Sequence, residues 1–148
     1  MPDTSPRGFA YTRDQFQQLA EDALALARTL GASEAGAEVS EGVGLSVSVR
    51  KGEVENVERN RDKSLGVTVY VGKRRGNAST SDFSRTALEQ TVRAAHDIAR
   101  FTAEDPAAGL PETEDMALGA AAQPDLDLFH PWAIDAEAAM QLALRCES

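Results

Sequence analysis

A change in hydrophobic period along the chain limits the fold more than any other feature of the sequence. Apolar residues recur at intervals of three and four over residues 13–30 and again over 84–103, which predicts two amphipathic helices. Between them the interval is two, most clearly over residues 65–71, which predicts half-buried strands. Such strands need a covered face, so we expect an α+β fold in which two helices pack on one face of an antiparallel sheet.

Both helices carry start signals. Thr12 and Gln15 form a capping box, and Tyr11 and Phe16 occupy the positions of a hydrophobic staple. Ser84 is the expected N-cap of the second helix. The stripe that this helix is expected to bury consists of Leu88, Val92, Ala95, Ile98, Ala99 and Thr102. His96 falls beside Glu89, Arg93 and Arg100 on the side expected to be solvated.

Short alternating segments predict a meander of four to five strands. They lie at residues 35–39, 45–49, 54–57, 65–71 and 77–81. Glycines are the expected turn residues between them, at Gly42, Gly44, Gly72 and Gly76, and Lys51–Gly52 is typical of a tight hairpin turn. On the strand that ends near residue 71, Thr68 and Tyr70 are expected to point outward.

Charge divides the chain of 148 residues, whose net charge is −9, into unlike parts. Residues 1–100 hold 14 basic and 14 acidic residues, whereas residues 101–148 hold Arg145 against ten acids. We therefore predict an α+β domain over 1–103, an extended acidic, proline-containing linker over 104–133, and over 134–148 the truncated start of a third helix, capped by Asp135. This helix is expected to lead to a missing carboxy-terminal domain, and the alternative is a frayed natural end.

Composition and motifs exclude several kinds of function. No apolar run reaches the length of about 18 residues that a membrane span needs, and no signal peptide is present, so we expect a cytoplasmic protein without membrane contact. No broad basic surface favours direct binding of nucleic acid. His96 and His130 lack further ligands at metal spacing, and no nucleophile has a partnered base, so no catalytic and no metal-binding residue is predicted.

One basic cluster is compact enough to bind a partner. Lys73, Arg74 and Arg75 lie together in a predicted hairpin turn, where solvated charge is the ordinary interpretation. Together with the outward Thr68 and Tyr70 they are the candidate residues for contact with a peptide or a partner protein.

Three blocks of sequence in fixed order resemble a known family. They are KGEVENVERNRDKSLGVTVYVGKRRGNASTSDFS, ALEQTVRAAHDIARFTAEDPAAGLPE and LDLFHPW. They are similar to the amino-terminal domain of the TldD/PmbA family (peptidase U62, also labelled modulator of DNA gyrase). The segments SerThrSerAspPhe and GluAspProxxxGlyLeuPro favour the PmbA branch, also called TldE, over the TldD branch.

The resemblance implies a heterodimer that degrades unfolded or small peptides and matures peptide antibiotics. The expected partners are a TldD-type catalytic subunit, which would hold zinc in an HExxxH motif, and extended peptides. This sequence has no HExxxH, so a non-catalytic role without a cofactor of its own is expected. The alternatives are a module for assembly or docking only, and a regulator that binds gyrase.

Overall fold

The computed structural model describes residues 9–116, 126–128 and 130–148. The chain divides into two compact units, Met1–Gly42 with Arg61–Leu110 and Val43–Asn60 with Pro111–Ser148. Parts of the predicted linker, residues 117–125 and Phe129, lie outside the described residues.

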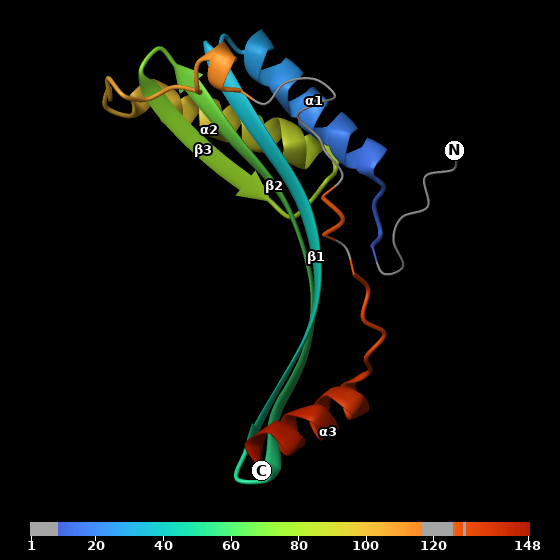
Figure 1. Cartoon of the computed structure of the whole chain (residues 1–148). Coiled ribbons are helices and arrows are strands. Elements are labelled where there is room, and N and C mark those ends of the chain that lie inside the picture. The colour runs from blue at the N-terminus through green and yellow to red at the C-terminus, as the bar shows by residue number, and fades with distance from the viewer. Residues whose placement is uncertain (1–8, 117–125, 129) are drawn as a thin grey trace. The chain divides into compact units, whose positions relative to one another are not determined.

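Three strands and two covering helices confirm the α+β expectation. The elements are α1 (Arg13–Thr29), β1 (Glu34–Arg50), β2 (Glu53–Val71), β3 (Arg74–Thr80), α2 (Arg85–Phe101), the short 3-10 helix η1 (Thr113–Asp115) and α3 (Ala136–Glu147). The sheet has the order β1-β2-β3, and β2 and β3 are antiparallel. In the first unit, α1 and α2 lie on the same face of this sheet (Figure 1).

The predicted number of strands, four to five, is wrong. The segments at 35–39 and 45–49 are both parts of β1, and those at 54–57 and 65–71 are both parts of β2. The error comes from the interpretation of glycine as a turn signal, because Gly42 and Gly44 lie inside β1.

Only two of the expected turns exist among these strands. Lys51 and Gly52 have φ of 55° and 77°, and two successive positive φ angles are typical of a type I′ hairpin turn. The second turn is Gly72–Lys73, where Gly72 has φ of 60°. Gly76 is not a turn residue, because β3 begins at Arg74.

Local capping sets the start and end of α1 as the sequence predicts. The Thr12 hydroxyl accepts from the Gln15 N–H at 3.2 Å, and the Gln15 side chain accepts from the Thr12 N–H at 2.8 Å. The rings of Tyr11 and Phe16 stack with centroids 5.8 Å apart. After the last turn, Gly31 has φ of 92°, a left-handed conformation that glycine adopts without strain.

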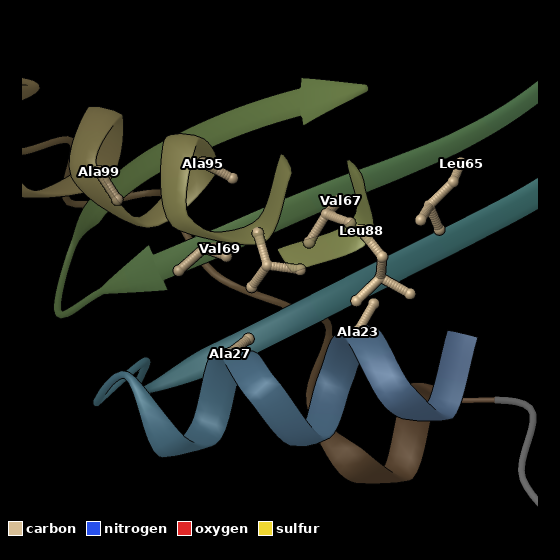
Figure 2. Packing of buried hydrophobic residues seen from close by; sticks show 9 residues of the cluster. Ala23, Ala27, Leu65, Val67, Val69, Leu88, Ala95 and Ala99 are labelled. Carbon is tan, nitrogen blue, oxygen red and sulfur yellow. The ribbon is translucent and has the colours of Figure 1, made fainter. Parts of the chain in front are cut away.

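The core lies between the helices and one face of the sheet (Figure 2). Its members are Ala23 and Ala27 of α1, Leu65, Val67 and Val69 of β2, and Leu88, Val92, Ala95 and Ala99 of α2. Alanine at the helix positions lets α2 approach β3 closely. At Gly76 the approach is so close that an added Cβ would collide with the Ala95 carbonyl oxygen and the Ala99 nitrogen.

Three predicted positions on α2 are wrong. Ile98 is 47% exposed and Thr102 is exposed, whereas Thr91 is buried and donates to the Ala87 carbonyl. His96 was expected on the solvated side, but only 13% of its side chain is exposed. The reason is that the backbone of α2 lies directly on Gly76 at Ala95 and Ala99, so contact with the sheet, and not the apolar pattern alone, decides which side chains of the helix are buried.

The second unit combines the end of the β1–β2 hairpin with α3. The Asp135 side chain accepts from the Ala138 N–H at 2.8 Å, so the predicted N-cap is confirmed. At the other end of α3, the Glu147 carboxylate accepts from the backbone N–H groups of Lys51 and Gly52 at 2.6 and 2.8 Å. The helix therefore satisfies backbone donors of the hairpin turn.

Candidate functional site

The face of the sheet opposite α1 and α2 contains a hollow of about 590 Å³. All three strands contribute to it. Its lining includes Gly36 and Glu38 of β1, Gly66, Thr68 and Tyr70 of β2, Arg75, Asn77 and Ser79 of β3, and Leu110 from the segment after α2. These strand positions alternate with the residues of the core, as the period of two requires.

Cross-strand pairing places the polar residues of the hollow next to one another. Thr68 is opposite Asn77, and Tyr70 is opposite Arg75 in the β2–β3 register. Residues that face each other across an antiparallel pair have Cβ atoms about 4.5–5.5 Å apart. Hydroxyl, amide and guanidinium groups thus converge on one surface.

Missing side chains create the depth of the hollow. Gly36 and Gly66 occupy positions on this face where other strand residues would project a side chain. An added Cβ at Gly66 would meet no atom within 4 Å, and one at Gly36 would meet only the Leu110 side chain at 4.0 Å. Neither glycine has a positive φ. The fold itself therefore does not require glycine at either position.

The structure brings three of the five predicted contact residues together. Thr68, Tyr70 and Arg75 all line the hollow, as expected for an outward face. Tyr70 differs from the expectation in its burial, since only 8% of it is exposed. Leu110 also lines the hollow, because the segment after α2 returns to this sheet, which the sequence did not indicate.

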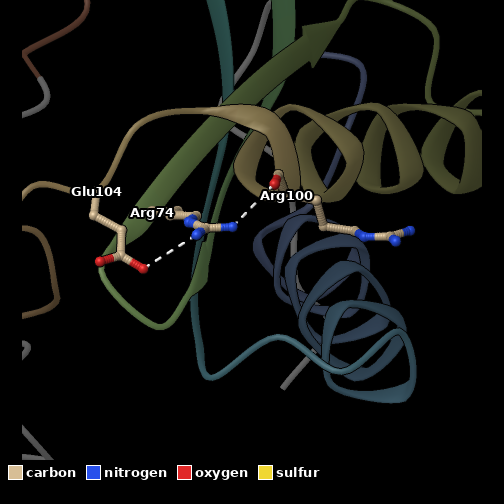
Figure 3. Close-up of polar contacts among 3 residues, drawn as sticks. All are labelled: Arg74, Arg100 and Glu104. Atoms are coloured by element: carbon tan, nitrogen blue, oxygen red, sulfur yellow. Dashed lines mark hydrogen bonds and ion pairs between the residues drawn. The ribbon is translucent and has the colours of Figure 1, made fainter.

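The other two predicted residues hold that returning segment. The Lys73 ammonium donates to the Ala108 carbonyl at 2.9 Å. Arg74 donates to the Arg100 carbonyl at 3.3 Å and pairs with the Glu104 carboxylate at 3.2 Å (Figure 3). Neither lines the hollow.

Glu34 fixes the end of the same segment. Its carboxylate accepts from the Leu110 N–H at 2.8 Å. The backbone N–H of Asp105 also donates to the Lys73 carbonyl at 2.9 Å. Residues 104–110 are therefore tied at several points to the strands that frame the hollow.

Opposite charges lie on the two outer strands of the hollow. Glu38 belongs to β1 and Arg75 to β3, on either side of β2. Within the part of the chain that the structure describes, neither has an ion-pair partner. Both charges are therefore available to a bound molecule.

A second polar cluster, away from the hollow, surrounds Lys63. Its ammonium lies 4.8 Å from the centre of the Phe83 ring and donates to the Tyr11 hydroxyl at 2.9 Å. Nearby, hydrogen bonds from the backbone N–H and the hydroxyl of Ser84 lower the pKa of Asp82, and the charge of Lys63 adds to this. This cluster secures the start of α2.

Over residues 9–116, 126–128 and 130–148, no three His, Cys, Asp or Glu side chains form a group that could hold a metal ion. The same residues contain no helix long and apolar enough to cross a membrane.

Comparison with known proteins places this fold in a family. Residues 35–99 match the family model described as PmbA/TldA metallopeptidase domain 1. The Metalloprotease PmbA of Escherichia coli O157:H7 is 48% identical over 134 residues, which are 88% of this chain and 29% of that protein. This chain belongs to the PmbA/TldD family. A Metalloprotease PmbA homolog of Haemophilus influenzae is 44% identical over 90% of the chain and 29% of its own length.

Solved structures of the PmbA/TldD family support the fold. A protein from Bacteroides thetaiotaomicron, described as a candidate modulator of DNA gyrase, matches with a TM-score of 0.67 and 26% identity over 85% of this chain and 27% of its own. TldE from Thermococcus kodakarensis matches with a TM-score of 0.56 and 17% identity over 62% and 21%, which shows the fold alone. The chain spans less than a third of the length of the curated PmbA relatives named above.

Several residues of the site were missed from the sequence of this PmbA/TldD-family domain. Gly36, Glu38, Asn77 and Ser79 lie on the hollow but were not singled out. One signal was available. Gly66 stands at an outward position inside the clearest alternation of the chain, where a glycine weakens a strand and often marks a close approach of another backbone or a ligand.

Proposed function

We propose that this chain is the non-catalytic amino-terminal domain of a PmbA (TldE)-type subunit in a TldD/PmbA metallopeptidase heterodimer. Its role is to contact the extended peptides on which the heterodimer acts, in proteolysis of unfolded or small peptides and in maturation of peptide antibiotics. The zinc of such an enzyme would be bound by the TldD-type subunit, and the described residues here offer no ligand set for it.

The observation that supports this proposal is the open sheet face. Thr68, Tyr70 and Arg75, from two adjacent strands, converge on a hollow that the helices leave uncovered. Lys73 and Arg74 contribute indirectly, since they hold the segment that ends at Leu110. An exposed strand edge of such a sheet can also hydrogen-bond a peptide main chain whatever its side chains, which suits an enzyme with broad substrates.

Crosslinking in the complete heterodimer tests the proposal. A peptide that carries a photoreactive group is trapped in the complex with an inactive TldD-type subunit, and the adducts are mapped by mass spectrometry. We expect adducts within residues 35–81 of this chain. A trapped peptide that reacts only with the partner subunit would contradict the proposal. A complex without peptide, irradiated in the same way, is the control.

A second candidate, an assembly module that never touches substrate, has its own observation. In the second unit a groove of about 590 Å³ is lined mostly by apolar residues, among them Val43, Leu45, Ile134 and Leu142, and Trp132 there is 70% exposed. If the domain only docks the partner, Trp132→Ala would weaken the heterodimer and residues 35–81 would yield no peptide adduct. A pull-down of purified gyrase with this chain alone tests the third alternative, regulation of gyrase.

A further inference from the structure

The part of the β1–β2 hairpin that belongs to the second unit is poorly covered. Every described residue of that unit is at least partly exposed, and α3 has no buried residue. Residues 53–60 of β2 are all exposed, among them Val54 and Val57 at 41% and 42%. A two-stranded hairpin is only marginally stable in water without further strands or a well-packed helix. This part of the hairpin would therefore gain stability from an added strand.

One edge of the same part of β2 is open. β2 lies between β1 and β3, but its pairing with β3 begins with Leu65 opposite Thr80 and continues only toward Val71. Among the described residues, no strand lies on that side of residues 53–60. Alternate residues of such an edge point their N–H and C=O groups outward. The edge can therefore pair with a strand of another molecule.

The order of charges along this edge indicates which strand fits. When residues 53–60 are opposed antiparallel to a second copy of themselves, with Val57 on the two-fold axis, Glu55 of each copy faces Arg59 of the other. The other opposing pairs within residues 54–60 contain no two like charges, and they are Asn56 with Glu58 and Val54 with Asn60. Opposite charges across a strand pair are stabilising, and like charges are destabilising. The strand is thus complementary to itself.

Neighbouring registers of this self-pairing are less favourable. A register centred on Glu58 opposes this residue to Glu58 of the other copy, so two like charges meet. A register centred on Asn56 opposes Glu55 to Val57, so Glu55 gains no opposite charge. The charges therefore favour the register centred on Val57.

Both charged residues of the favoured register are accessible. Arg59 is exposed and, within the part of the chain that the structure describes, has no ion-pair partner. Glu55 lies 3.7 Å from Arg50, but both side chains are more than half exposed. Such a surface pair contributes little to stability. It therefore does not prevent Glu55 from facing Arg59 of a second copy.

From these observations we propose that residues 53–60 of β2 pair, antiparallel and about a two-fold axis at Val57, with the same residues of a second copy of this chain. The two hairpins then form one continuous sheet. A surface that is complementary to itself is what a two-fold dimer requires. This inference goes beyond the proposed function and does not rest on it, because it concerns contact between two identical chains.

Sedimentation velocity of the complete 148-residue chain tests the proposal. We expect a monomer–dimer equilibrium that salt weakens, because the charge pairs are exposed. Glu55→Arg and Arg59→Glu each turn both charge pairs of the dimer into like pairs, so each variant alone should associate at least about tenfold more weakly. An equimolar mixture of the two variants restores opposite charges at both pairs and should dimerise again. A wild-type chain that stays monomeric, single variants that dimerise as it does, or a mixture that does not dimerise would overturn the proposal.

Glu58→Arg is the matched control for these variants. It reverses the same charge on the same strand, but residue 58 faces Asn56 in the favoured register. This variant should dimerise about as strongly as the wild type. Circular dichroism and the melting temperature check that all three variants remain folded, as expected for exposed positions. An equal loss of dimer in Glu58→Arg would show that net charge and not register is responsible, and the proposal would be wrong.

A disulfide locates the two-fold axis. The exposed Cys146 is first replaced by serine, so that Val57→Cys supplies the only thiol. The two copies of residue 57 face each other with Cβ atoms about 4.5–5.5 Å apart, and mild oxidation should link them. Val54→Cys is the control, because its exposure is similar but its two copies lie roughly 20 Å apart along the strands. Equal yields of covalent dimer from both variants would contradict the proposed register.

Discussion

The two faces of the same strands are filled in opposite ways. On one face Val67 and Val69 are buried under α1 and α2, where alanines of the helices bring the layers close together (Figure 2). On the other face Thr68 and Tyr70 border a hollow floored in part by glycine. Small residues thus serve close packing on the first face and leave room on the second. The comparison teaches that a glycine must be judged by what would occupy the space of its missing side chain.

The largest expected effect comes from Gly76. Gly76→Val pushes a side chain against the backbone of α2 at Ala95 and Ala99, which cannot yield as a flexible side chain would. We expect a loss of about 3 kcal/mol in the free energy of unfolding, the upper part of the usual range for overpacking. Urea denaturation followed by circular dichroism measures it. Gly66→Val is the matched control, and an equal loss in both variants would remove the distinction between the faces.

Adjacent residues of β2 give the next largest contrast. Val67 is 2% exposed on the covered face, and truncation to alanine should cost about 2 kcal/mol through lost burial and the cavity that remains. Thr68 is its neighbour on the other face, and Thr68→Ala should change the free energy of unfolding by no more than about 0.5 kcal/mol. Both values come from the same denaturation experiment. Similar costs would mean that the second face is packed as well.

The same contrast explains which parts of the fold the sequence predicts. Local signals are sufficient for the cap at Thr12, the turn at Lys51–Gly52 and the alternation over 65–71, because each depends on a few neighbouring residues. They fail where the role of a residue depends on backbone that is distant in sequence. Gly76 was interpreted as a turn residue because nothing near it in sequence reveals that α2 lies against it.

The candidate site follows the same rule. Alternation places Thr68 and Tyr70 on the outward face, and the structure agrees. The part of Leu110 in the hollow beside Tyr70 could not be predicted, because Leu110 comes forty residues later in the chain and is fixed there by a hydrogen bond to Glu34. The low content of basic residues after residue 100 made the segment around Leu110 look like a free linker.

A gain in stability is expected on the open face. Gly36→Ala and Gly66→Ala should each raise the free energy of unfolding by roughly 0.5–1 kcal/mol, because alanine restricts the unfolded chain and neither position has a clash or a positive φ. Thermal and urea denaturation of each variant measure the gain. A lower free energy of unfolding at either position would show that the fold itself requires glycine there.

The smallest expected effect is a change in the free energy of unfolding at acid pH, and it comes from Asp82, just before the start of α2. Hydrogen bonds from Ser84 lower the pKa of Asp82 below its ordinary value of 3.8, so its ionised form stabilises the folded state. This contribution to stability is complete above the pKa that Asp82 has in the unfolded chain. It is lost as the pH falls through the lower pKa that Asp82 has in the folded protein. Asp82→Asn should therefore flatten the stability curve in that acid range. Glu38→Gln, on the open face, removes an equal charge that has no such hydrogen bonds, and an identical flattening there would show that net charge alone is responsible.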